Sequence, residues 1–215
     1  LVMAGYQGWF NAPDDGARRG WYHYTGHDGF KPGSCTIDLW PEVSEYEKLY
    51  KTEFVFEDGS PAYTFSSYDA STVDTHFRWM EEYGIDGVFM QRFVAEIRNK
   101  CGKKYLSKVL DSAMESANRH SRAICIMYDL SGMNPGDENV LIADIKELAE
   151  RHSLFDHDSN PSYLYHNGKP LVTVWGVGFD DGRKYGYKEA DKILTALEDM
   201  GFSIILGVPT QWRTL

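Results

Sequence analysis

The sequence has no apolar run close to the roughly 20 residues that a membrane-spanning helix requires. Basic residues are also in short supply, because 22 Lys and Arg stand against 32 Asp and Glu and give a net charge of −10. A nucleic-acid-binding protein needs a basic face for the phosphates, so this balance argues against a nucleic-acid partner. The composition therefore indicates neither a membrane span nor a nucleic-acid interface.

Cysteine is scarce, and its spacing excludes the usual cysteine sites. The three cysteines, Cys35, Cys101 and Cys125, leave at least one unpaired. None belongs to a C-x-x-C pair or to a pattern of zinc ligands, so neither a metal site nor a disulfide framework is predicted. Cys125 stands within an apolar stretch and is predicted to be a small core residue. No cofactor is implied.

The chain has the profile of a globular protein with an unusual supply of aromatic rings. Its 215 residues are 42% hydrophobic and 25% charged, which predicts one domain, residues 1–215, with a sizeable core. Aromatic residues reach 14%. Aromatic faces can stack on the C–H faces of sugar rings while polar groups beside them bind hydroxyls. Any single Trp is nevertheless more often a core residue than a ligand contact.

Apolar strand patterns alternate with helical patterns along the chain. Ser71-Thr72-Val73-Asp74 resembles a capping box that opens a helix, and Gly84 closes that helix. Strands that are apolar on both faces are typical of a parallel sheet covered by helices. Strands are predicted over residues 3–10, 85–93, 122–129, 170–176 and 202–208, with four helices between them and a long loop over residues 11–70.

Two architectures fit this alternation, a doubly wound open sheet and a (β/α)₈ barrel of the TIM type. The first turn, Gly5-Tyr6-Gln7-Gly8, lacks the G-x-G-x-x-G fingerprint and does not lead into a helix, which disfavours a nucleotide-binding fold. Polar and aromatic groups at the strand ends favour the barrel. Because five strands and four helices are fewer than a barrel needs, we expect this chain to be the N-terminal part of one.

Polar and aromatic residues follow the carboxyl ends of the predicted strands and would converge on one mouth. Asp129 is the most informative carboxylate, because it ends a buried strand and suits a supporting role in acid–base chemistry. Its alternative role is to cap the turn that follows. Arg92 could clamp a substrate oxygen or form a structural ion pair, for example with Glu96. The strand-end residues are Tyr6, Gln7, Trp9, Gln91, Arg92, Tyr128, Asp129, Trp175 and Trp212.

Histidines gather in the long first loop. His23, His27 and Asp28 share one glycine-flanked stretch. They superficially resemble a metal cluster, but hydrogen bonding to substrate hydroxyls is the favoured interpretation because no third ligand stands at a defined spacing. His76 and His120 lie on or beside helices and are predicted to be at the surface.

Several segments carry a resemblance to a known group of enzymes. These segments are Gly5-Tyr6-Gln7-Gly8-Trp9-Phe10, Asp38-Leu39-Trp40-Pro41, Gly87-Val88-Phe89-Met90-Gln91-Arg92-Phe93, Met127-Tyr128-Asp129 and Val174-Trp175-Gly176. Together they look like the N-terminal half of bacterial proteins similar to glycoside hydrolase families 71 and 99, whose Bacteroides-like relatives are often labelled xylosidase/arabinosidase.

The resemblance implies a (β/α)₈ barrel with α-glucanase or endo-α-mannosidase activity, a carbohydrate substrate, and a periplasmic or extracellular location. It also implies that Tyr6 and Trp40 line sugar subsites. The family's two catalytic glutamates lie in a Glu-Trp-His-Glu-like segment, which does not occur in residues 1–215. The main acid–base pair is therefore expected beyond Leu215.

The primary hypothesis is a glycoside hydrolase of barrel fold. A carbohydrate-binding protein without catalytic carboxylates is the alternative, and a barrel enzyme for a substrate other than a sugar is a third possibility.

Overall fold

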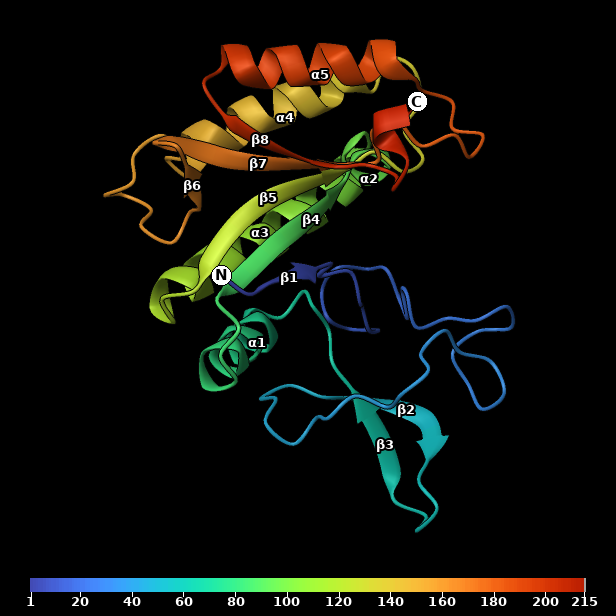
Figure 1. Ribbon diagram of the computed structural model, residues 1–215. Coiled ribbons are helices and arrows are strands. Elements are labelled where there is room, and N and C mark those ends of the chain that lie inside the picture. The colour runs from blue at the N-terminus through green and yellow to red at the C-terminus, as the bar shows by residue number, and fades with distance from the viewer. Residues whose placement is uncertain (215) are drawn as a thin grey trace.

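The computed structural model describes residues 1–214 and shows an α/β fold with a parallel sheet at its centre (Figure 1). Neighbouring strands in this sheet follow one another in sequence. The parallel strands are β1 (Met3–Tyr6), β4 (Gly87–Phe93), β5 (Ala123–Asp129), β7 (Lys169–Trp175) and β8 (Ser203–Gly207), and the long helices between them are α1 (Ala70–Glu82), α3 (Lys100–Arg119), α4 (Glu138–Arg151) and α5 (Tyr187–Asp199).

The order of the strands decides between the two predicted architectures, a doubly wound open sheet and a barrel. Each parallel strand pairs with the next one along the chain, so every crossover moves across the sheet in the same direction. Right-handed crossovers that never reverse direction place all their helices on one face. The sheet is thus singly wound, as in a barrel, and not doubly wound. Within residues 1–214, however, β1 and β8 are not paired with each other, and no closed barrel is shown.

The two faces of the sheet are buried to different extents. Side chains such as Met90, Ile126 and Val174 point toward the helices and are buried in the main core. On the opposite face, Gln91 and Met127 are half-buried and Ile205 is exposed. The helices therefore cover one side only, and Figure 1 shows α4 and α5 against β7 and β8.

The predicted loop over residues 11–70 contains regular structure that the sequence prediction missed. An antiparallel hairpin of β2 (Tyr50–Val55) and β3 (Pro61–Thr64) projects away from the parallel sheet (Figure 1). Aromatic side chains supply its core, because Trp40 contacts Phe54 at a ring-centroid distance of 5.1 Å. Three other short elements were also not predicted: α2 (Val94–Ile97), β6 (Tyr165–His166) and the 3₁₀ turn η1 (Trp212–Thr214).

Two predicted boundaries were wrong for local reasons. The first strand ends at Tyr6 because Gly8 adopts φ +56°, which turns the chain out of the sheet. The predicted capping box at Ser71 does not form, since α1 already begins at Ala70. The N-cap residue, Asp69, uses its carboxylate to accept hydrogen bonds from Lys48 and Tyr50 of the hairpin segment instead.

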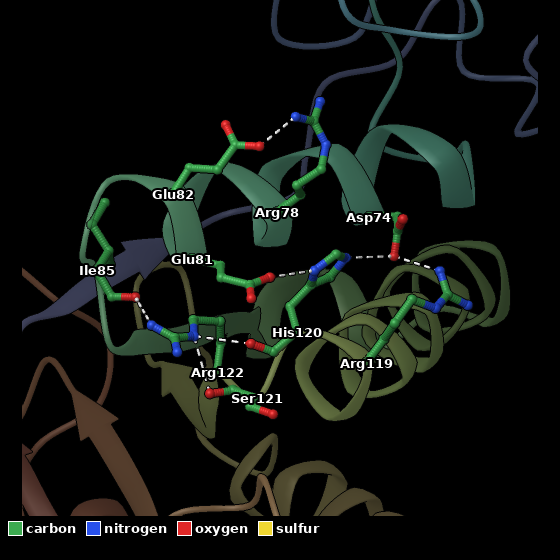
Figure 2. A network of polar contacts seen from close by, with 9 residues as sticks. All are labelled: Asp74, Arg78, Glu81, Glu82, Ile85, Arg119, His120, Ser121 and Arg122. Atoms are coloured by element: carbon green, nitrogen blue, oxygen red, sulfur yellow. Dashed lines mark hydrogen bonds and ion pairs between the residues drawn. The ribbon is translucent and has the colours of Figure 1, made fainter.

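A polar network at the amino end of the sheet fastens α1 to the end of α3 (Figure 2). His120 lies between two carboxylates, with Nδ1 2.9 Å from Glu81 Oε2 and Nε2 3.2 Å from Asp74 Oδ1. The Arg122 guanidinium donates to the backbone oxygens of Ile85 and His120. The prediction that His120 is a surface residue was wrong, because only 12% of its side chain is exposed.

None of the helices within residues 1–214 combines the length and the apolar character needed to cross a membrane.

Candidate functional site

Four neighbouring strands present one row of residues at their carboxyl ends. Phe93 is in register with Asp129, Asp129 with Trp175, and Trp175 with Gly207. Residues in register on parallel strands point to the same side of the sheet, here the side without helices. The carboxyl edge of a parallel sheet is also where ligands bind in α/β folds.

Asp129 and Gln91 form the polar centre of this row. Gln91 Nε2 lies 2.6 Å from Asp129 Oδ2, and the Ser131 amide donates to Asp129 Oδ1 over 2.8 Å. A carboxylate can only accept, so the amide nitrogen of Gln91 faces it and the amide oxygen is turned away. Asp129 is 4% exposed. It therefore caps its turn, as one interpretation predicted, and also orients Gln91.

A cavity of about 520 Å³ adjoins this centre, between the loops that follow β5 and β7. Ser131, Arg183 and Tyr185 line it. Arg183 donates to both oxygens of Asp181 and to the Gly176 carbonyl, so these contacts join the two ends of the loop after β7. The volume of this cavity is within the range of small-molecule sites.

Trp175 supplies an accessible aromatic surface to the row. Trp175 is 42% exposed, although the five residues before it in β7 are buried. Its ring lies over the β8 backbone at Gly207, where a Cβ would stand 2.2 Å from the indole. Phe179 contacts the same ring at a centroid distance of 5.5 Å. Gly207 is thus needed for the position of the Trp175 ring.

A stack of three rings continues the row toward the first loop. Trp9 lies parallel to Phe93 at 5.3 Å and to His23 at 4.0 Å, with interplanar angles of 12° and 17°. His23 reaches this position from a left-handed backbone conformation, φ +60°. Burial, and then the charge of Arg19, lower the pKa of His23, so the ring is neutral at pH 7. The structure therefore brings Trp9 and His23 together with Asp129 and Trp175 along one edge.

Gly176 directly follows β7 and has a backbone conformation that residues other than glycine rarely adopt. Its φ is +108°, and an added Cβ would lie 2.6 Å from Arg183 Nη1 and 2.8 Å from the Tyr185 hydroxyl. We expect Gly176→Ala to lower the free energy of unfolding by about 2–3 kcal/mol, as measured by urea denaturation. Gly182→Ala is the matched control, because Gly182 also has positive φ but open space around it. An equal loss in both variants would show that backbone strain alone accounts for the effect.

Arg92 and Tyr128 were wrongly predicted to face the mouth. Both point to the helix side, and Arg92 is 2% exposed. Arg92 donates to both oxygens of Asp144 in α4, over 2.6 and 2.8 Å, and the Tyr128 hydroxyl donates to the same carboxylate over 2.7 Å. Burial opposes ionisation of Asp144, but the hydrogen bonds and charge of Arg92 hold its pKa below the usual range. Arg92 forms a structural ion pair, as one interpretation predicted, but its partner is Asp144 and not Glu96.

Tyr6 and Trp40 also have structural contacts that keep them away from the row. The Tyr6 hydroxyl lies 2.8 Å from His76 Nδ1, on the helix side of β1. The Trp40 indole donates to the Tyr63 carbonyl over 2.8 Å, within the hairpin. Because these side chains are engaged elsewhere, the sugar-contact role predicted for them is not supported by their positions.

The remaining predicted site residues lie outside the row. Gln7 is exposed beyond the end of β1, and Trp212 is exposed in η1 beneath the Arg213 guanidinium. His27 and Asp28 pair with each other over 3.0 Å on an exposed part of the first loop. Within residues 1–214, no group of three or more His, Cys, Asp or Glu side chains is placed to hold a metal ion.

Phe93 was missed by the sequence prediction, although its signal was present. It stands two positions after Gln91 on the same strand, and alternate residues of a strand share a face. Once Gln91 is placed at the site, this period of two also places Phe93 there.

Comparison with known proteins finds similarity among solved structures only. No protein-family profile and no curated protein matches the sequence. A GH99 endo-alpha-mannosidase from Bacteroides thetaiotaomicron is 14% identical, with a TM-score of 0.48, and the match covers 80% of this chain and 44% of that one. This chain resembles a family 99 glycoside hydrolase. A structure described as that enzyme with BIS-TRIS-propane gives 15% identity and a TM-score of 0.47, covering 83% of this chain and 41% of the other. The chain thus spans less than half the length of these structures.

Proposed function

We propose that this chain carries a carbohydrate-binding surface of a glycoside hydrolase. The observation that carries the proposal is the row of rings at the carboxyl edge, with a carboxylate and an amide between them. Trp175 offers an exposed apolar face for a sugar ring, and the partly buried rings of the Trp9 stack offer a second apolar contact. Gln91 stands between them as a hydrogen-bonding group for hydroxyls.

Hydrolysis of a glycosidic bond requires an acid that protonates the leaving oxygen and a second carboxylate that acts as base or nucleophile. Asp129 accepts hydrogen bonds at both oxygens and is almost fully buried, which suits it to positioning Gln91 and not to proton transfer. In this proposal the acid–base pair is supplied by residues outside those described. The same burial of Asp129 favours one alternative, a carbohydrate-binding protein without hydrolytic activity.

The test is calorimetric titration of the protein with oligosaccharides from α-mannan, α-glucan, xylan and arabinan. We expect one class to bind, and Trp175→Ala to weaken that binding about tenfold, equivalent to roughly 1.4 kcal/mol. Tyr83→Ala is the control, because Tyr83 is an exposed aromatic residue at the end of α1. Affinity that is unchanged by Trp175→Ala, or absence of binding to every saccharide, would contradict the proposal.

Hydrolysis of the same saccharides by the natural protein separates the two candidate functions. Turnover supports the glycoside hydrolase. Binding without turnover supports the carbohydrate-binding protein.

A further inference from the structure

A second cavity, of about 590 Å³, lies between the first loop and the beginning of α3. Its wall includes three cationic side chains, Arg18, Arg19 and Lys104, and one carboxylate, Glu96. The chain as a whole has a net charge of −10, so this local excess of positive charge runs against its composition. Charges of one sign in a concave wall raise the local concentration of ligands of the opposite sign.

Arg19 is the most firmly held of these cations. Its guanidinium lies 3.6 Å from the centre of the Tyr22 ring and 4.4 Å from that of Tyr105. Nη2 donates to Glu96 Oε2 over 3.0 Å. The side chain is only 17% exposed. Two rings and one carboxylate thus fix the plane of the guanidinium before any ligand arrives.

One nitrogen of this guanidinium has unused donor capacity. Arg19 Nη1 is buried and has no hydrogen-bond partner among residues 1–214. A buried N–H without an acceptor is costly, so an oxygen atom brought to this position is bound favourably.

The cavity is connected to the candidate site by a continuous series of rings. Tyr22 contacts His23 at a centroid distance of 4.5 Å. His23 stacks on Trp9, and Trp9 on Phe93, which is in register with Asp129. These ring contacts run from the wall of the cavity to the carboxyl edge of the sheet.

We propose that this cavity binds the acidic group of a saccharide, a uronate carboxylate or a sulfate ester, while the neutral sugar units lie on the ring series. The inference rests on the proposed function and narrows its substrate class to acidic glycans. Arg18 and Lys104 are exposed and attract the anion, and Arg19 supplies the oriented donor.

The experiment is calorimetric titration of the protein at low ionic strength with matched pairs of oligosaccharides. One pair is xylotriose with and without a glucuronic acid substituent, and the other is mannotriose with and without a 6-sulfate. We expect the acidic member of at least one pair to bind about tenfold more tightly than its neutral counterpart. Sodium sulfate is expected to compete with the acidic member and not with the neutral one, and the pair that responds identifies the acidic group.

Arg18→Gln/Lys104→Gln is expected to remove the preference and leave the affinity for the neutral member unchanged. Lys169→Gln/Lys188→Gln is the matched control, because it removes the same charge from exposed positions on β7 and α5. Neutral and acidic members that bind equally would overturn the anion site and leave the proposed function standing. If no saccharide binds, both the acidic-glycan site and the proposed function are overturned. The same holds if inorganic sulfate binds but no saccharide does.

Discussion

Replacing Arg92 with methionine is expected to lower the free energy of unfolding by about 3–5 kcal/mol. The substitution removes both hydrogen bonds from the guanidinium to Asp144 and leaves that carboxylate charged in the core between β4 and α4. The Tyr128 hydroxyl and Lys103, whose Nζ lies 3.5 Å from Asp144 Oδ1, supply only part of the lost stabilisation. Urea denaturation followed by circular dichroism measures the change.

The double variant Arg92→Met/Asp144→Leu tests the cause of that loss. Because it removes both charges, we expect it to be more stable than Arg92→Met alone and to recover at least half of the loss. Arg78→Met is the control for an exposed ion pair, since Arg78 contacts Glu45 and Glu82 at the surface. It should lower the free energy of unfolding by less than about 1 kcal/mol. A double variant no more stable than the single one would show that the ion pair is not the source of the effect.

Acidification from pH 6.5 to pH 4 is expected to remove about 3 kcal/mol of stability through His76 alone. His76 lies between two tyrosines, with Nδ1 2.8 Å from the Tyr6 hydroxyl and Nε2 2.6 Å from that of Tyr46. Burial lowers its pKa from 6.5 to about 4. Between these values the unfolded chain binds a proton that the folded chain does not, so stability falls as the pH falls.

The measurement compares the free energy of unfolding of the protein and of His76→Gln across this range. Other groups also titrate there, so the prediction concerns the difference between the two slopes. His76→Gln should have the shallower dependence on pH, whereas His27→Gln, at an exposed position, should follow the unchanged protein. Parallel curves for the protein and His76→Gln would contradict the assignment.

The parallel part of the fold could be predicted because its signals are local. Residues 122–129 and 170–176 are almost continuously apolar, and in the structure β5 and β7 fall within two residues of those ranges. The turn at Asn167-Gly168 also has a local sequence signal, because Asn-Gly is typical of tight hairpin turns. Both residues have positive φ and join β6 to β7 as a tight hairpin turn.

The β2–β3 hairpin was missed although its pattern can be read. Tyr50–Val55 alternates between buried and exposed side chains, and Asp58-Gly59 provides a turn before Pro61. Its position within a long, aromatic-rich stretch led to the interpretation of the whole of residues 11–70 as a loop. Here the alternation was the better guide, because it reports which side chains the sheet buries.

The partners of charged and polar side chains could not be predicted, for a different reason. Arg92 and Asp144 are 52 positions apart, and His76 is 70 positions from Tyr6. No local pattern connects such residues, since their contact depends on how α4 and α1 pack on the sheet. The same holds for the Trp9 stack, in which Trp9 and His23 from two parts of the first loop meet Phe93 of β4.

The order of the strands in the sheet has a consequence for how the protein folds. Met3 pairs with Gly87, whereas Gly87 pairs with Ala123 across a much shorter stretch of chain. Each doubling of the segment that must be closed costs about 0.6 kcal/mol of chain entropy, before any contact can compensate for it. We therefore expect β4, β5 and β7 to assemble first and β1 to join last. The ring stack that Trp9 completes then becomes a late product of folding, formed on a sheet that already exists.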